Sequence, residues 1–395
     1  MDRNRVVITG IGVLSHFGCG VANLMKHIDS KQALSEIKNF SINKFDLSTE
    51  SICTDRKLRR LLTDGGSYAL HTIHEAISQS NLDLPSIDTS KIGVFFGKKE
   101  KNIFDHNRTR YVEIMDKHDD EIAKGTDPIQ IIMNYWPSAL SPAELLKVLP
   151  NLDVFIICTL YQLHGPSFTY LTPYISALQG LESAWNAIAC GQLMAAVVTG
   201  TSLSIDPIEA ARHEEINRFG LSAFGEGAAT IVLEEFQSAK ARSTEIICEV
   251  LDVNNYMIPE QVNPSKKKQE MQGAFVEQFI SQNFQDSILI TFNDSLLNED
   301  GAGQVMEVAN NPFVFSQSTR GLLGIQDCAG GLLHTVLSAC QLKDKQLIGN
   351  ITCNTIPSED RLNEKNWDGA HAHISMVSAE GFAATAVLKA STNNE

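Results

Sequence analysis

Cysteine and histidine are the residues of this 395-residue chain best suited to nucleophilic, acid-base or metal chemistry. His71 and His74 lie three residues apart on a predicted helix, and His371 and His373 alternate on a predicted strand. Neither pair has a carboxylate or cysteine set at the spacing of a zinc site, so we expect structural or surface roles and no bound metal. The cysteines are scattered at positions 19, 53, 158, 190, 248, 328, 340 and 353 without a Cys-x-x-Cys pair. This pattern predicts reduced thiols in a cytoplasmic protein, because disulfide frameworks are typical of short secreted chains.

Composition and charge exclude several classes of protein. A hydrophobic fraction of 43% and a charged fraction of 20% are those of a folded chain, and the length predicts two or three packing units. The formal net charge of -15 argues against nucleic acid or an anionic membrane surface as a partner. No signal peptide and no apolar run of about 18 residues is present, so we expect a soluble protein. The glycines at positions 10, 12, 18 and 20 lack the G-x-G-x-x-G spacing of a dinucleotide site.

Strand-like and helix-like segments alternate in the first half of the chain. The β-branched run at residues 5–12 predicts a buried strand, and residues 92–97 predict a second one. Between them, apolar residues recur at helical spacing within residues 66–80. This alternation favours a mostly parallel sheet with helices packed against it.

A buried helix and a central strand are expected next, at residues 176–190 and 194–200. The second half of the chain echoes the first, because residues 245–250 and 287–292 look like strands at comparable positions. We therefore expect a duplicated α/β unit. The polar stretch at residues 263–271 predicts an exposed loop or a helix start.

Three segments together resemble the β-ketoacyl synthase family of the thiolase-like superfamily. Residues 5–15 (RVVITGIGVLS) resemble the first strand of the family and the loop after it. Residues 220–229 (GLSAFGEGAA) resemble its G-x-x-x-G-E-G-A segment. Residues 164–200, which begin with His-Gly-Pro, resemble the region from the R-G-P loop to the helix behind the nucleophile.

The resemblance implies an α/β protein of the thiolase-like fold, with duplicated α/β halves in a five-layer αβαβα arrangement. The halves are expected at residues 1–244 and 245–395. An insertion at about residues 98–165 is expected to contribute to the subunit interface and to a substrate tunnel.

Catalysis in this family uses a cysteine at a helix N-terminus and two histidines. The helix dipole and backbone amides stabilise the thiolate and the later oxyanion, and the histidines assist decarboxylation of a malonyl unit on an acyl carrier protein. The resemblance places Tyr174 at the cysteine, Asn293 at the first histidine and Ile325 at the second, within a G-H-x-x-G-A-A-G motif that falls at residues 324–331. A phenol with a pKa of about 10 has no thiol chemistry, and isoleucine transfers no proton. We therefore expect no catalytic residue at these places.

Two further departures agree with a loss of catalysis. Arg320 replaces a family lysine shortly before the second histidine place, and residues 378–384 lack the pattern of the glycine-rich gating loop. A chain that keeps the fold but not the catalytic residues is similar to the chain-length factors of bacterial type II polyketide synthases, which are non-catalytic ketosynthase homologues (ketosynthase beta subunits). Most of them carry glutamine where this chain has Tyr174.

That similarity implies a heterodimer with an active ketosynthase, in which this chain shapes the tunnel that controls the chain length of an aromatic polyketide. It implies no cofactor on this chain, because phosphopantetheine is carried by the acyl carrier protein. Since a carrier protein is expected to be acidic, a chain with a net charge of -15 is a poor docking surface for it. We expect the carrier to dock mainly on the ketosynthase.

The end of the tunnel is expected in the segment at residues 102–112. Phe104, Asn107 and Tyr111 lie at positions i, i+3 and i+7, on one face of a predicted helix. By resemblance they match the positions that gate chain length in aromatic-polyketide chain-length factors. The alternative is a helix that packs two aromatic side chains into ordinary core.

Two other functions stay open. The chain could be a condensing or decarboxylating enzyme with a rearranged site, in which Cys328 or Cys158 acts as the nucleophile. It could also be a purely structural interface protein that contributes nothing to a tunnel.

Overall fold

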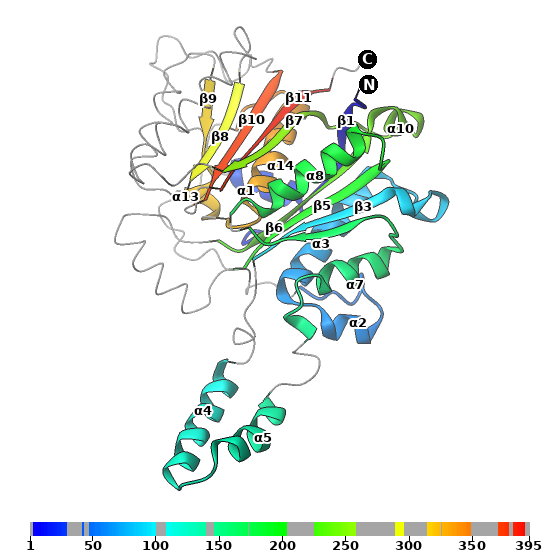
Figure 1. Cartoon of the computed structure of the whole chain (residues 1–395). Helices are drawn as coiled ribbons and strands as arrows, with labels where there is room; N and C mark the ends of the chain where they lie inside the picture. Colours follow the sequence, from blue (N-terminus) through cyan, green and yellow to red (C-terminus); the bar gives the residue numbers. More distant parts are fainter. Residues whose placement is uncertain are drawn as a thin grey trace.

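The computed structural model of the chain describes residues 3–29, 42, 47–99, 108–139, 146–172, 174–203, 225–257, 289–295, 314–324, 326–348, 370–378 and 382–391. It contains a twisted sheet with helices packed on it, from which one pair of helices projects (Figure 1). The strands are β1 (Val6–Ser15), β2 (Gly18–Cys19), β3 (Ile92–Gly97), β4 (Ser167–Tyr170), β5 (Ala195–Ser202), β6 (Gly227–Glu235), β7 (Cys248–Met257), β8 (Leu289–Ser295), β9 (Val314–Gln317), β10 (His371–Val377) and β11 (Phe382–Ala390). The helices are α1 (Val21–Asp29), α2 (Arg56–Leu61), α3 (Asp64–Ser80), α4 (Arg108–Ala123), α5 (Pro128–Ala139), α7 (Leu152–Tyr161), α8 (Ser176–Ala189), α10 (Phe236–Ala241), α13 (Arg320–Leu323) and α14 (Gly330–Asp344), with short 3₁₀ turns η2 (Leu84–Ser86) and η3 (Thr89–Lys91).

The elements expected from the sequence are present. The helices predicted at residues 66–80 and 176–190 are α3 and α8, and the predicted strands are β1, β3, β5, β7, β8 and, at His371 and His373, β10. The polar stretch at residues 263–271 lies outside the described residues. Hydrophobic periodicity was therefore enough to locate these elements.

The sheet consists of two halves with the same topology. Its strand order is β4-β3-β5-β6-β1-β7-β11-β10-β8-β9, and β2 pairs with β1 off this path. We number the strands of each half in chain order and leave out β2. Read from the outer edge of the sheet to its centre, both halves then have the strand order third, second, fourth, fifth, first. They join where Val6–Ile8 of β1 pairs antiparallel with Cys248–Val250 of β7. This repeat is the duplicated α/β unit expected from the sequence, whereas the boundary at residues 244 and 245 stays a prediction.

The expectation of a mostly parallel sheet is wrong. β3 is parallel to β4 and β5, and β8 is parallel to β9 and β10. In contrast, β6 and β11 run antiparallel to both of their neighbours. Only four residues separate β10 from β11, too few for the crossover of a dozen or more residues that a parallel pair requires. The alternation of strands and helices in the sequence does not show in which direction β6 and β11, the last strand of each half, run.

Helices α8 and α14 lie between the two halves of the sheet. Helix α8 packs on β3, β5 and β7, and α14 packs on β6, β10 and β11, so each helix touches strands of both halves. Helix α3 packs on β1, β5 and β6. These contacts give an outer helix, the first half of the sheet, an inner helix pair and the second half of the sheet, in the order of the predicted αβαβα stack.

The glycines of β1 allow α3 to pack directly on the strand backbone. A Cβ atom at Gly10 would overlap the carbonyl oxygen of Ala76, and one at Gly12 would overlap that of Thr72. A larger residue at either position would push the helix away from the strand. The Gly-Ile-Gly sequence therefore serves helix packing here.

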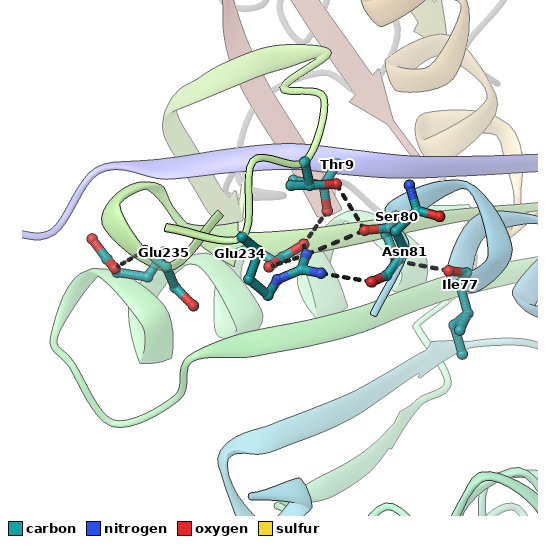
Figure 2. A network of polar contacts seen from close by, with 9 residues as sticks. Thr9, Ile77, Ser80, Asn81, Glu234 and Glu235 are labelled. Atoms are coloured by element: carbon teal, nitrogen blue, oxygen red, sulfur yellow. Dashed lines mark hydrogen bonds and ion pairs between the residues drawn. The ribbon is translucent and has the colours of Figure 1, made fainter. Parts of the chain in front are cut away.

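An ion pair with a buried carboxylate links α3 to β1 and β6, within the polar network of Figure 2. The carboxylate of Glu234 on β6 is completely buried and accepts hydrogen bonds from the Thr9 hydroxyl and the Arg242 guanidinium. Arg242 also donates to the carbonyl oxygens of Asn81 at 2.7 Å and Ser80 at 3.2 Å, at the C-terminus of α3. The guanidinium thus satisfies helix carbonyls that have no partner within the helix.

We expect His373 to make the stability of the protein depend on pH. Its side chain is fully buried on β10, and burial lowers its pKa to about 4. The pKa of a histidine in an unfolded chain is about 6.5, so the unfolded chain binds a proton more readily than the folded one. The stabilisation from neutral, buried His373 is therefore complete above that pH and is lost as the pH falls toward 4. From this difference in pKa, we expect the free energy of unfolding to fall by about 2 kcal/mol between about pH 7.5 and about pH 5.

Urea unfolding of the wild type and of His373→Gln across this pH range measures the effect. Burial raises the pKa of Glu75, which acts in the opposite direction, and the difference between the two proteins isolates His373. Identical pH dependence of the two unfolding free energies would contradict the prediction.

Candidate functional site

Tyr174, the residue that the resemblance places at the nucleophile, lies just before the N-terminus of α8. Tyr174 stands two residues before this helix, and its side chain is completely buried in the hydrophobic core. Its backbone φ is 69°, a left-handed conformation that is uncommon for a bulky residue. The end of β3 reaches the same place, because a Cβ atom at Gly97 would overlap the amide nitrogen of Ala177. The fold therefore holds residue 174 at a tight junction between a strand and a helix.

A carboxylate engages the backbone amide of Tyr174. The N–H of Tyr174 donates to Oδ1 of Asp327 at 3.1 Å. The Lys99 ammonium lies 4.0 Å from Oδ2 of the same carboxylate. Asp327 precedes α14, in the segment at residues 324–331. No pattern in the sequence assigns Asp327 a role, although its carboxylate stands inside this glycine-rich segment.

The thiol nearest to this place is that of Cys328. It is completely buried against the Tyr174 backbone and the Ser176 hydroxyl. Burial, and secondly the charge of Asp327, raise the pKa of Cys328 far above its usual range. Burial also raises the pKa of Cys158. Because the thiolate is the nucleophilic form, both thiols are poorly suited to the nucleophilic role that a rearranged site would require.

The two histidine places are only partly described. Asn293 lies on β8, opposite Ser375 of β10 in the parallel register. Ile325 lies outside the described residues. Arg320 is the first residue of α13.

Of the three expected gate residues, Tyr111 alone falls within the described residues. Phe104 and Asn107 are outside the described residues, and α4 begins at Arg108. Tyr111 belongs to α4, of which only the backbone is described at this position. The shared helical face of the three residues stays a prediction.

The histidine pairs named in the sequence lie on α3 and β10. Burial lowers the pKa of His71 and of His371, and His74 Nδ1 lies 3.5 Å from the Tyr161 hydroxyl. Within the part of the chain that the structure describes, no three His, Cys, Asp or Glu side chains are grouped as a metal site requires. None of its helices is long and apolar enough to span a membrane.

A buried ion pair links the two chain segments that precede and follow the projecting helices. Lys98 follows β3 and Asp153 lies in the first turn of α7, so the two residues flank the segment that contains α4 and α5. Their side chains are 8% and 0% exposed, and Lys98 Nζ lies 2.7 Å from Oδ2 of Asp153. The hydroxyl of Thr63, which caps α3, donates to the same carboxylate at 2.9 Å. This pair was not anticipated from the sequence.

Comparison with known proteins decides the family. The model of the N-terminal domain of β-ketoacyl synthases matches residues 3–239, more than half of the chain. The chain belongs to the β-ketoacyl synthase family. This confirms the family resemblance drawn from the sequence.

Curated relatives of this β-ketoacyl synthase family member are named as synthases. The 3-oxoacyl-[acyl-carrier-protein] synthase 2 of Coxiella burnetii is 22% identical over 384 residues, which cover 87% of each chain. The 3-oxoacyl-[acyl-carrier-protein] synthase 1 of Buchnera aphidicola is 24% identical over 65% of this chain and 67% of its own length.

Solved structures show that this family member has the thiolase-like fold. A type II PKS acyl-carrier protein in complex with its ketosynthase bound to the hexaketide matches with a TM-score of 0.74 and 19% identity, over 98% of this chain and 100% of the other. The ishigamide ketosynthase/chain length factor matches with a TM-score of 0.76 and 15% identity, over 99% and 100%. The predicted fold class is confirmed.

Proposed function

We propose that this chain is a chain-length factor, a non-catalytic member of its family that pairs with an active ketosynthase in the cytoplasm and shapes the tunnel for an aromatic polyketide. The observation that carries the proposal is the head of α8. A buried tyrosine stands at the place of the nucleophile, and the carboxylate of Asp327 engages its amide. Burial also keeps the neighbouring Cys328 thiol protonated. In this proposal the partner subunit therefore carries out the condensation.

The likeness to the ishigamide ketosynthase/chain length factor supports this role, since it extends over 99% of the chain. The proposal assigns phosphopantetheine to the acyl carrier protein and no cofactor to this chain. It keeps the expectation that the carrier docks mainly on the ketosynthase, because the net charge of this chain is -15.

The edge strand β4 is the surface that we assign to the ketosynthase subunit. β4 ends the order of the described strands and pairs with β3 on one side, so among the described residues no strand pairs with its other side, where backbone donors and acceptors are available. Two aromatic side chains are exposed here, Phe168 on β4 at 52% and Phe155 on the adjacent α7 at 55%. Exposed aromatic residues beside an open strand edge suit a partner that extends the sheet and covers them.

A second candidate, a condensing synthase with a rearranged site, is favoured by the names of the curated relatives. One experiment separates the two. The purified chain is incubated with malonyl-acyl carrier protein, while carbon dioxide release and the intact mass of the chain are followed. We expect no turnover and no acyl adduct above the level of a buffer control.

The same assay with an active ketosynthase partner added is the positive control, and condensation is expected only there. Robust decarboxylation or a stable acyl adduct on the isolated chain would overturn the proposed function in favour of the synthase.

The gate proposal gives a separate prediction about the product. We expect Phe104→Ala or Tyr111→Ala, in the complex with the ketosynthase, to lengthen the polyketide. A bulky side chain that closes a tunnel imposes an overpacking cost of about 1 to 3 kcal/mol on a longer chain, enough to change product ratios by about tenfold. Mass spectrometry of the products measures this change.

Met133→Ala is the matched control, because Met133 is 71% exposed on α5 of the same projecting segment. Unchanged product length in both gate variants, with an intact complex, would favour the purely structural interface role.

A further inference from the structure

The backbone amide of residue 174 lies at the place that the family resemblance gives to the nucleophile. In acyl-transfer enzymes, backbone N–H groups beside the nucleophile stabilise the oxyanion that forms during the reaction. In this chain, the corresponding N–H donates to a carboxylate oxygen of Asp327 at 3.1 Å. A negatively charged oxygen of the protein therefore stands where a donor would otherwise be available to a substrate oxygen.

Asp327 is held in place by its neighbours in sequence. The Gln326 side chain donates to the carbonyl oxygen of Leu323 at 2.8 Å. On the other side, the amide of Ala329 donates to the hydroxyl of Ser202, at the end of β5, at 3.2 Å. Because Gln326 before Asp327 and Ala329 two residues after it are both hydrogen-bonded, the Asp327 carboxylate is presented to Tyr174 by a fixed loop.

The two inner helices are linked through these contacts. The amide before α8 is bound by Asp327 from the second half of the chain, and the amide before α14 is bound by Ser202 from the first half. The close approach of Gly200 on β5 to Ala177 and Ala329 puts the two helix heads together. The contact between Tyr174 and Asp327 is thus one of two reciprocal bonds across the halves.

The bond also suits the conformation of Tyr174. A left-handed backbone at a bulky residue is unfavourable and persists where surrounding contacts determine it. A hydrogen bond from the amide to a charged acceptor is stronger than one to a neutral acceptor. Lys99, 4.0 Å from the carboxylate, offsets its charge.

We propose that Asp327 is a positioning residue that occupies the amide donor at the head of α8, holds Tyr174 in its left-handed conformation and keeps substrate oxygens from that donor. The inference rests on the proposed non-catalytic role and deepens it. Loss of catalysis is built into the loop before α14 as well as into the residue that replaces the nucleophile. A cysteine placed at position 174 would consequently meet a neighbouring carboxylate, which disfavours the thiolate.

The test compares Tyr174→Cys with Tyr174→Cys/Asp327→Asn. Alkylation of the introduced thiol by iodoacetamide is followed over pH by peptide mass spectrometry. The single variant is expected to titrate above the usual value of about 8.5. Asparagine in place of Asp327 leaves Lys99 as the nearby charge. We expect this change to lower the pKa of the introduced thiol by about one unit or more, and to speed its alkylation near neutral pH about tenfold.

Tyr174→Cys/Asp344→Asn is the matched control, because it makes the same charge change at an exposed residue at the end of α14. Equal thiol pKa values in the presence and absence of Asp327, or an equal shift in the control, would overturn the proposal.

A measurement on the native tyrosine decides the case if the cysteine variants do not fold. The chain contains seven tyrosines, so ¹⁵N-tyrosine labelling gives a short set of amide signals, and the signal missing in Tyr174→Phe is that of Tyr174. We expect its proton to move upfield in Asp327→Asn, and an unmoved signal would refute the contact. Neither measurement uses malonyl substrate. The decarboxylation assay can therefore contradict the proposed function while the role of Asp327 stands, and these measurements can contradict the role of Asp327 while the proposed function stands.

Discussion

Replacing Lys98 with methionine is expected to lower the free energy of unfolding by about 3 to 5 kcal/mol, because it leaves the Asp153 carboxylate buried without its cation. The Asp153 side chain is completely buried, and its remaining donors are the hydroxyl and amide of Thr63. Gly66 leaves no room for rearrangement, since even a Cβ atom there would overlap the carboxylate. Urea unfolding followed by circular dichroism measures the loss.

Lys124→Met provides the matched control for this change. Lys124 forms an ion pair of similar length, 2.8 Å, with Glu121, but its side chain is 66% exposed. Exposed pairs contribute little to stability, so we expect no measurable change there. The double variant Lys98→Met/Asp153→Leu should recover part of the loss, because it removes both charges. Equal stability of Lys98→Met and the wild type would show that the ion pair does not stabilise the protein.

Placing glutamate at Phe168 is expected to weaken the heterodimer at least about 100-fold, because a carboxylate would be buried in the subunit interface without a partner. The fold of the isolated chain should survive, since this side chain is half exposed on the edge strand β4. Co-purification with the ketosynthase, and light scattering of the mixture, measure the loss.

Met257→Glu is the comparison variant for the interface. Met257 has a similar exposure, 60%, but lies at the end of β7, in the middle of the strand order. It should leave the complex intact. A heterodimer that tolerates Phe168→Glu as well as it tolerates Met257→Glu would remove β4 from the proposed interface.

Much of the fold followed from the sequence, because it depends on local patterns. The strand at residues 92–97 and the helix at residues 176–190 were visible in their hydrophobic periodicity. The glycine segments and their order pointed to the family, which the match over residues 3–239 confirmed. Strand direction was missed, since it depends on connections that periodicity does not describe.

Less of the candidate site could be predicted, because its contacts join residues far apart in sequence. Resemblance points to Tyr174, but the carboxylate that binds its amide lies 153 positions later. Lys98 and Asp153 are 55 positions apart, and each reads in the sequence as an ordinary surface charge. No sequence period brings such pairs together. Only the packing of the strands and helices does.

The inner position of α8 has a consequence for how the chain is made. Trp185 of α8 donates to the carbonyl oxygen of Val250 on β7 at 3.0 Å, so part of the helix is covered by residues that leave the ribosome late. At about 5 to 20 residues per second, synthesis of residues 248–390 takes roughly 7 to 30 s. Throughout that time the nascent first half presents an uncovered apolar helix. Chaperones that recognise such surfaces are expected to bind it until the second half closes over it.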